Sequence, residues 1–287
     1  MDEAHVLGEK VAFVRAGEGP PLVFLHNGGT SHSIWLPVIE QLRSEFTCVA
    51  IDLLGYGASS HPEGGATMDL HVEVLAQLLR QLSLRDPVLI GNCMGSAISL
   101  TFTARHPGAA RALVLVNPLT RRTLSAGRLA PFVKFRAALP GAAARVYGAA
   151  SKLRLPSWTA RPVLATQLGK SGRRQGLQAH APLVACHASN GQLGSLLSVL
   201  DDLDAYGSLD DFERPEGHPP TLLLWGEENQ VLPPRAIERL ARALKPEVKA
   251  GIPGAGHLVM LEEPSLVAAS IRRFVGSLTA PREVVAS

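Results

Sequence analysis

A cysteine stands in the chain where a strand and a helix are predicted to meet in a very tight turn. Residues 88–96 read Val-Leu-Ile-Gly-Asn-Cys-Met-Gly-Ser, so an apolar run leads into Gly-x-Cys-x-Gly. Glycines two residues on either side of Cys93 let the two backbones close without clashes, and the turn gives the cysteine strained dihedral angles. The helix N-terminus favours an anion, so we expect the thiol to ionise more readily than a free cysteine. By itself the pattern fits a catalytic nucleophile and an ordinary buried cysteine equally well, and the residues around it decide between them.

A glycine-rich loop is the second candidate for chemistry. Residues 26–29 read His-Asn-Gly-Gly and directly follow the apolar run at residues 22–25. Glycine lets backbone N–H groups approach a substrate oxygen closely. In an architecture with a nucleophile at a strand–helix turn, this loop supplies one half of an oxyanion hole. We therefore predict that the backbone N–H groups of Gly28 and Met94 are its two donors, and that His26 orders the loop rather than transferring a proton.

The elements that must position these groups alternate between strand and helix. Apolar runs bounded by turn residues predict strands, and apolar residues at helical spacing predict helices, one of them capped by Thr67. From about residue 120 to residue 219 no clear strand is found, and the alternation then resumes. The strands are predicted at residues 10–15, 22–25, 46–51, 88–90, 112–116, 221–225 and 247–252, and the helices outside the interruption at 34–44, 67–82, 97–105, 234–244 and 264–278.

This order predicts an α/β fold with a mostly parallel, doubly wound sheet. Residues 1–119 and 220–287 would form the core domain, and residues 120–219 a helical cap inserted into it. The composition agrees with one large domain, because 287 residues with 46% hydrophobic and 18% charged residues can bury a full core.

The composition also excludes several classes of protein. A net charge of +3 is too small and scattered to indicate nucleic-acid binding. No run is long and uncharged enough to cross a membrane, and no export signal begins the chain, so we expect a cytoplasmic protein. Its three cysteines form neither a disulfide framework nor a zinc motif, and we predict no metal and no cofactor.

Landmarks along nearly the whole chain resemble the α/β-hydrolase superfamily. They occur in the order found in that family and comprise the loop at residues 26–29, Asp52 with Gly55 and Gly57, the Gly91–Gly95 turn, Trp225-Gly226 with Asn229, and Gly256-His257 with Pro264. The resemblance implies an α/β-hydrolase fold, with the interruption at residues 120–219 as its cap. It also implies the order nucleophile, acid, histidine, which assigns these roles to Cys93, the Asn229 position and His257.

Two residues depart from the family pattern. Most members have serine where this chain has Cys93, and aspartate where it has Asn229; Asn117 also occupies the position that carries the acid in some relatives. A thiol is acidic enough to give its proton to His257 before substrate arrives, and we expect the Asn229 carbonyl to suffice for holding the imidazole Nδ1–H. Papain-like proteases use the same Cys-His-Asn set on another fold. A rearranged loop that brings Glu228 to the histidine is the alternative.

A covalent thioester on Cys93 is the expected intermediate, formed from an ester or thioester substrate. Its acyl group can pass to water, to another acceptor, or within the substrate, so hydrolysis, acyl transfer and cyclisation are all open. Because His257 lacks an acidic partner, transfer or cyclisation is favoured. A lyase that uses His257 as general base to eliminate a carboxylate or other leaving group is an alternative, and a non-catalytic ligand-binding protein is another.

The predicted cap is rich in apolar residues and would form the lid of an apolar pocket. We predict a medium-sized hydrophobic acyl substrate, free or borne by coenzyme A or a carrier protein. The Ala- and Arg-rich composition indicates a GC-rich bacterial source and a role in secondary metabolism. The oligomeric state is not predicted. The residues predicted to contact substrate are Asn27, Phe132, Phe135 and Trp158.

Overall fold

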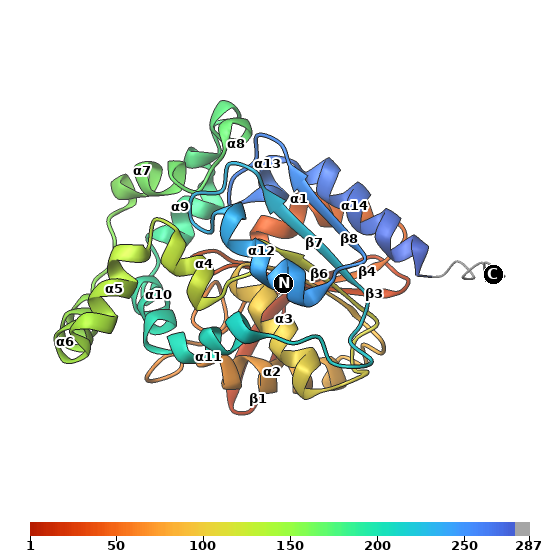
Figure 1. Ribbon diagram of the computed structural model, residues 1–287, viewed down its shortest axis with the longest axis horizontal. Helices are drawn as coiled ribbons and strands as arrows, with labels where there is room; N and C mark the ends of the chain where they lie inside the picture. The colour runs from red at the N-terminus through yellow and green to blue at the C-terminus, as the bar shows by residue number, and fades with distance from the viewer. Residues whose placement is uncertain (279–287) are drawn as a thin grey trace.

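The computed structural model describes residues 1–278, which form an eight-stranded sheet with helices on both faces (Figure 1). The strand order is β1-β2-β4-β3-β5-β6-β7-β8; β1 pairs with β2, and β2 with β4, in antiparallel fashion, and all other pairs are parallel. The strands are β1 (Asp2–Val6), β2 (Glu9–Ala16), β3 (Pro21–Leu25), β4 (Thr47–Ile51), β5 (Val88–Asn92), β6 (Ala112–Val116), β7 (Thr221–Gly226) and β8 (Val248–Ile252).

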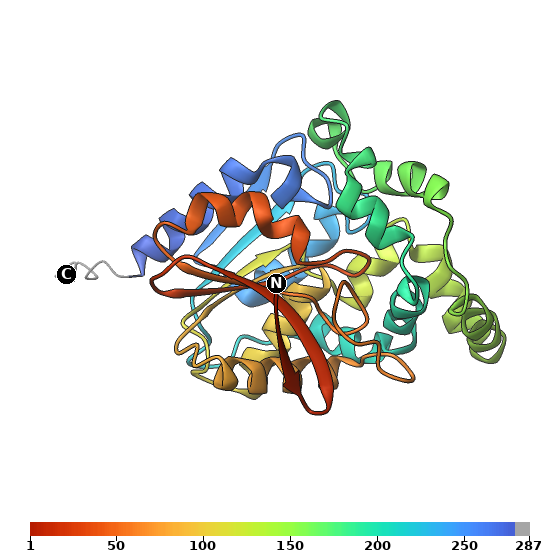
Figure 2. The ribbon, with the colours of Figure 1, turned by 180° about the vertical axis from the view of Figure 1, so that it is seen from behind.

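The central strands are apolar throughout because both faces of the sheet are covered. In β3, Val23 and Leu25 face one core cluster, whereas Leu22 and Phe24 face the other. Figures 1 and 2 show the two helical layers on opposite sides of the sheet. One layer contains α2 (Met68–Gln81), α3 (Met94–Arg105) and α12 (Pro234–Leu244), and the other contains α1 (Leu36–Leu42), α13 (Val259–Glu262) and α14 (Pro264–Ser277).

Between β6 and β7 every described regular element is a helix. These helices gather on the side of the sheet where β6 ends and β7 is followed by its loop (Figure 1, green to cyan). They are α4 (Arg121–Ala126), α5 (Ala130–Ala138), α6 (Pro140–Ala150), η2 (Ser157–Thr159), α7 (Ala160–Ala165), α8 (Lys170–Arg174), η3 (Leu177–Ala179), α9 (Ala181–His187), α10 (Gln192–Asp201), α11 (Leu203–Gly207) and η4 (Ser208–Asp211).

Most predicted elements are present, with shifted ends. The first predicted strand lies within β2, and β1 was missed. The helix predicted from residue 34 is divided into the 3₁₀ turn η1 (His32–Trp35) and α1, because Pro37 begins a new helix there. The predicted cap of α2 is confirmed, since the Thr67 side chain accepts a hydrogen bond from the Leu70 N–H.

Both predicted boundaries of the cap fall in loops: residue 119 lies between the end of β6 and the start of α4, and residue 220 lies directly before β7. Residues 279–287, which the prediction assigned to the core domain, lie outside the described residues. Within residues 1–278 no helix is long and apolar enough to cross a membrane.

Candidate active site

Cys93 lies in the tight turn between β5 and α3, with φ 53° and ψ −108°. A positive φ is strained for a residue with a side chain and is often found at functional sites. The turn closes because its flanking glycines touch: a Cβ on Gly91 would lie 2.2 Å from the carbonyl carbon of Gly95. A Cβ on Gly95 would lie 2.3 Å from the backbone oxygen of Leu25. The predicted role of both glycines is therefore confirmed.

The Cys93 thiol is buried, with 8% of the residue exposed. Burial raises the pKa of the thiol to about 12, and the hydrogen bond from the Met94 backbone N–H lowers it only in part. The prediction that this thiol ionises more readily than a free cysteine is wrong for the resting site, because desolvation outweighs the helix N-terminus. Cys93 rests as a thiol.

His257 follows β8 and lies in a buried loop. Its backbone N–H donates to the Gln167 carbonyl at 2.6 Å, and its own carbonyl accepts from the side-chain amides of Asn92 at 3.3 Å and Asn117 at 3.2 Å. Burial lowers the pKa of the imidazole to about 4. The thiolate–imidazolium pair expected from the sequence is therefore absent at rest, and a neutral imidazole accompanies a neutral thiol.

Asn229 contacts the imidazole, as predicted, but through the opposite end of its amide. Its Oδ1 accepts the backbone N–H groups of Val231 and Leu232, each at 3.0 Å. The amide nitrogen Nδ2 then lies 3.2 Å from Nδ1 of His257. The expectation that the Asn229 carbonyl holds an Nδ1–H is therefore wrong, because backbone donors in the same loop already occupy that oxygen.

Neither of the other two residues considered as the histidine partner, Glu228 and Asn117, contacts the imidazole. The Glu228 carboxylate accepts the backbone N–H of Lys170 at 2.9 Å and pairs with the side chains of Lys170 at 3.2 Å and Arg173 at 3.6 Å. The Asn117 side chain bonds to Asn92 and to the His257 carbonyl, not to the ring. Among the residues described, Asn229 is thus the hydrogen-bonding partner of the His257 ring.

The predicted oxyanion donors face the same cavity as Cys93. Within residues 1–278, the backbone N–H of Gly28 has no hydrogen-bond partner, and that of Met94 points toward the Cys93 thiol. His26 orders the loop as predicted: its Nδ1 donates to the Asn27 carbonyl at 2.7 Å, and its Nε2 accepts from Leu53 N at 2.9 Å. Burial lowers the pKa of His26 to about 4, which keeps that ring neutral.

Asn92 is a residue that the sequence reasoning missed. Its side-chain amide bonds to Oδ1 of Asn27 at 3.1 Å as well as to the His257 carbonyl. The Asn27 amide nitrogen in turn donates to the Gly28 carbonyl at 2.9 Å. The signal was a polar residue at the end of an otherwise apolar strand, next to Cys93. Asn92 thus connects the loop at residues 26–29 to the loop of His257.

A cavity of about 300 Å³ brings these groups together. Predicted site residues Asn27, Gly28, Cys93, Met94, Phe132 and His257 all line it. Leucines of α10, which no sequence signal singled out, form much of its apolar wall. The other lining residues are Leu119, Leu124, Arg128, Leu129, Val163, Thr166, Gln167, Leu193, Leu196, Leu197, Val199, Leu200 and Val231.

Two predicted substrate contacts lie elsewhere. Trp158 is 78% exposed and does not line the cavity. Phe135 packs edge-on against Tyr147, with ring centroids 6.2 Å apart, and does not line the cavity either. Both residues stand on helices whose orientation depends on packing that the local sequence does not encode.

A family model described as alpha/beta hydrolase fold matches residues 20–264. The chain belongs to this family. The match confirms the predicted fold, and the strand–turn–helix at Cys93 and the loop of His257 both fall within it. The chain is thus an α/β-hydrolase-fold enzyme. Cys93 and Asn229 are the two residues of its candidate site that differ from the serine and aspartate of most members.

Curated relatives and a solved structure agree with this assignment. Haloalkane dehalogenase 2 of Mycobacterium bovis is 25% identical over 272 residues, which cover 91% of this chain and 90% of that protein. The 2-(acetamidomethylene)succinate hydrolase of Mesorhizobium japonicum is 24% identical over 267 residues, covering 90% and 89%. A malate-bound thermophilic esterase from Thermogutta terrifontis superposes with a TM-score of 0.80 at 24% identity, covering 97% and 99%, and this likeness concerns the fold.

The buried Glu262 ties the His257 loop of this α/β-hydrolase-fold enzyme to the helical segment. Its carboxylate accepts backbone N–H groups from Gly256 at 2.8 Å, Gly169 at 2.7 Å and Gly172 at 3.1 Å. Gly256 directly precedes His257, while Gly169 and Gly172 belong to the start of α8. One side chain therefore ties the loop of His257 to the start of α8.

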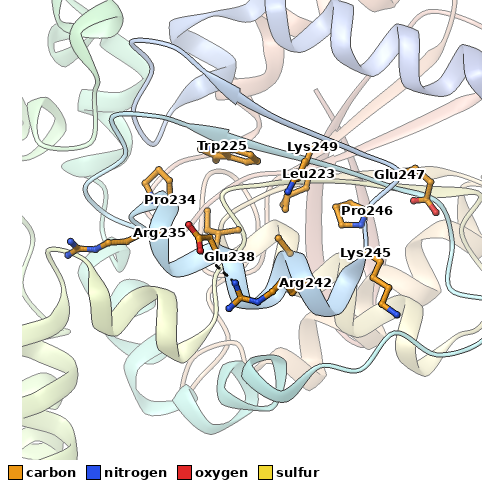
Figure 3. A pocket seen from close by; sticks show the side chains of 12 residues that line it. Leu223, Trp225, Pro234, Arg235, Glu238, Arg242, Lys245, Pro246, Glu247 and Lys249 are labelled. Carbon is orange, nitrogen blue, oxygen red and sulfur yellow. Dashed lines mark ion pairs between the residues drawn. The ribbon is translucent and has the colours of Figure 1, made fainter.

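A larger hollow, of about 710 Å³, lies between α12 and strands β7 and β8 (Figure 3). Trp225 of β7 lines it together with charged side chains of α12 such as Arg235, Glu238 and Arg242, and Arg242 is paired to Glu238 at 3.7 Å. None of the predicted catalytic residues lines this hollow. We therefore assign the candidate active site to the smaller cavity.

The pKa of Cys93 gives a prediction for its reactivity. Because burial raises that pKa to about 12, the thiolate fraction and the alkylation rate should rise about tenfold per pH unit between about pH 7 and pH 10. The measurement is iodoacetamide labelling followed by intact mass, in a Cys48→Ala/Cys186→Ala variant that leaves one thiol. A rate that is already at its plateau near neutral pH would indicate a thiolate–imidazolium pair and contradict the neutral resting site.

Proposed function

We propose that this enzyme carries out acyl chemistry on an ester or thioester of a medium-sized hydrophobic small molecule, with Cys93 as the acyl acceptor. One observation carries the proposal: a strained cysteine opens onto an apolar cavity together with the N–H of Met94, the ring of His257 and the N–H of Gly28, which has no partner within residues 1–278. A nucleophile, two oxyanion donors and a histidine around one cavity are the parts that acyl transfer requires.

The chemical step balances with groups of this chain alone. The Cys93 sulfur attacks the carbonyl carbon, a C–S bond forms, and the negative charge that develops on the carbonyl oxygen is held by the N–H groups of Gly28 and Met94. The bond to the leaving group then breaks, and the thiol proton ends on the leaving oxygen or sulfur. His257 lines the cavity, and a ring that bears its proton on Nε2 would donate a hydrogen bond to the leaving oxygen or sulfur rather than take up the thiol proton.

The cavity supports the proposed substrate class. Its volume of about 300 Å³ is at the lower end of the range for small-molecule sites, and leucine and valine side chains dominate its wall. Arg128 is the charged residue in the wall, and its guanidinium bonds to the Gln230 side chain at 2.7 Å. Such a wall fits a hydrophobic acyl group, while coenzyme A or a carrier protein would have to remain outside.

Haloalkane dehalogenation, the activity in the names of several relatives, does not fit a cysteine. A sulfur that displaces halide from an alkyl carbon forms a thioether. A thioether has no carbonyl for water to attack, so such an enzyme would stop after one event. The acyl chemistry proposed above avoids this problem because a thioester remains reactive.

The two alternatives of other classes have less support. An eliminating lyase needs a free lone pair on Nε2 of His257, and the Asn229 amide does not favour that form of the ring. A ligand-binding protein has no need for a cysteine held at a positive φ. A thiol nucleophile must also stay reduced, which agrees with the proposed cytoplasmic location. Bacterial secondary metabolism as the setting is a proposal from composition.

A panel of activated esters and thioesters with increasing acyl length, together with a haloalkane, tests this function. With N-acetylcysteamine present as acyl acceptor, we expect turnover of esters and thioesters with a preference for medium chains, and no catalytic halide release. Leu196→Trp should shift the preference toward shorter chains, because Leu196 lines the cavity beside Gly28. Leu153→Trp is the control, since Leu153 is exposed and outside the wall. Sustained halide release without ester turnover would refute the proposal.

A further inference from the structure

We infer that Asn229 holds His257 with its proton on Nε2, so that an acyl group on Cys93 resists water and leaves to an amine or a thiol. The inference rests on the proposed function, because it concerns the fate of the acyl-enzyme. Asn229 would be a positioning residue: by orienting the His257 ring, it would decide which acceptor takes the acyl group from Cys93. Its basis is the orientation of one buried amide.

The orientation of that amide is determined by its surroundings. Oδ1 of Asn229 accepts two backbone N–H groups, those of Val231 and Leu232, each at 3.0 Å. A flipped amide would give up both hydrogen bonds and place its own N–H atoms against two N–H donors. Because the residue is buried, water cannot replace the lost partners. The NH₂ group therefore faces the imidazole.

The NH₂ group in turn decides where the His257 ring carries its proton. An amide nitrogen can only donate, so Nδ1 at 3.2 Å must accept, and the proton of the neutral ring lies on Nε2. Protonating the ring fully would put an Nδ1–H against the amide N–H atoms. The ring therefore points a hydrogen-bond donor toward its surroundings and is a poor base. The other titratable or charged side chains in the cavity wall are Cys93 and Arg128, and neither is a carboxylate that could replace the missing acid.

A poor base slows attack on the acyl-enzyme by water more than attack by a thiol or an amine. Water has a pKa near 15.7, so its attack on a thioester depends strongly on a base that removes its proton. A thiol, with a pKa of about 8.5, is already a few per cent thiolate near neutrality, and a neutral amine carries its own lone pair. An attacking amine forms a C–N bond, breaks the bond to Cys93 and gives one of its own protons to the Cys93 sulfur. An attacking thiolate forms a C–S bond and breaks the same bond, and the Cys93 sulfur takes from solvent the proton that the acceptor thiol had released there. The site thus favours transfer over hydrolysis.

The first experiment determines the tautomer of His257 by ¹⁵N NMR and does not depend on an activity assay. In protein labelled with ¹⁵N-histidine, and with His257 identified by its loss in His257→Gln, we expect an unprotonated Nδ1 and a protonated Nε2. Asn229→Asp should reverse this pattern, because a carboxylate accepts a proton-bearing Nδ1. Asn190→Asp, which adds the same charge at an exposed position, should leave the wild-type pattern unchanged. A protonated Nδ1 in the wild type would overturn the inference even if Asn229→Asp does not fold.

The second experiment reads the fate of the acyl group. Enzyme acylated by an activated ester is followed by intact mass in buffer alone, with N-acetylcysteamine, or with hydroxylamine. We expect the adduct to persist in buffer and to disappear at least about a hundredfold faster with either acceptor. Asn229→Asp should speed loss to water by about 10²–10⁴-fold, because exchanging aspartate for asparagine in a triad costs about 10⁴ through the wrong tautomer. Asn190→Asp should not.

The outcomes separate the inference from the proposed function. If no adduct forms on the wild type, the proposed function fails, and the tautomer measurement still stands on its own. If an adduct forms but hydrolyses as fast in the wild type as in Asn229→Asp, the proposed function survives and the inference is overturned. Equal rates of loss with and without the two acceptors would also overturn it.

Discussion

Replacing Cys93 by alanine is expected to lower turnover of the best ester substrate by about 10⁴-fold or more and to leave the fold intact. In the proposed reaction the thiol provides the bond-forming atom, and alanine has no group that could take its place. Alanine differs from cysteine only by the missing SH group, so the exchange leaves at most a small gap at this buried position. The measurement is kcat/KM for wild type and variant, with circular dichroism and thermal unfolding to verify folding.

The other two cysteines supply matched controls. Cys48 is buried in β4 and Cys186 lies partly buried in α9, and neither lines the cavity. Cys48→Ala and Cys186→Ala should therefore keep activity within a few-fold of wild type. If Cys93→Ala retained wild-type turnover of the ester, Cys93 would only shape the pocket and would not be the acyl acceptor.

Gly95→Ala is expected to destabilise the protein by about 4 kcal/mol or more, which is exceptional for one methyl group. The added Cβ would lie 2.3 Å from the Leu25 oxygen and 2.7 Å from the Leu25 carbonyl carbon, so two backbones must separate. Those backbones belong to β3 and α3, which frame the turn that contains Cys93. Urea unfolding measures the loss, and any variant that remains folded should be strongly impaired because Cys93 is displaced.

Gly148→Ala is the matched control for this change. Gly148 lies within α6, and a Cβ there would meet nothing within 4 Å. Alanine in a helix is favoured over glycine, so this variant should be more stable than wild type by about 0.5–1 kcal/mol. A Gly95→Ala protein as stable as the Gly148→Ala protein would contradict the close packing assigned to the turn.

Much of the core domain could be predicted because its signals are local. The run Leu22–Leu25 is apolar at every position, which indicates a strand covered on both faces, and β3 is buried in that way. The missed strand β1 has a different pattern, with Ala4 and Val6 buried between exposed polar residues. Its pairing with β2 depends on a hairpin at the edge of the sheet, where a short alternating segment gives a weak signal.

Those features of the candidate site that depend on the spacing of residues along the chain could be predicted from the sequence. The turn at Cys93 and the contact between Asn229 and His257 follow from motifs in their own loops. The orientation of the Asn229 amide depends on where the N–H groups of Val231 and Leu232 point, which residue types do not specify. The raised pKa of Cys93 depends on burial by distant parts of the chain, so the local argument from the helix N-terminus had the wrong sign.

The predicted cap shows why substrate contacts were hardest to foresee. Its helices are short and connected by many turns, so apolar residues recur on several faces. Trp158 was chosen for its size and is exposed, whereas Leu193, Leu196, Leu197 and Leu200 form one wall of the cavity from a single helix, α10. Which apolar face turns inward depends on packing between helices that lie far apart in the sequence.

The most direct test of the central claim is to locate the acyl group on the chain. Wild-type enzyme treated with an activated ester is quenched, digested with trypsin and mapped by mass spectrometry; the peptide of residues 86–105 contains Cys93 and neither of the other two cysteines. The account predicts the acyl mass on that peptide and its absence in Cys93→Ala. Steady turnover with Cys93 unmodified at every time point, or an acyl group confined to Cys48 or Cys186, would contradict it.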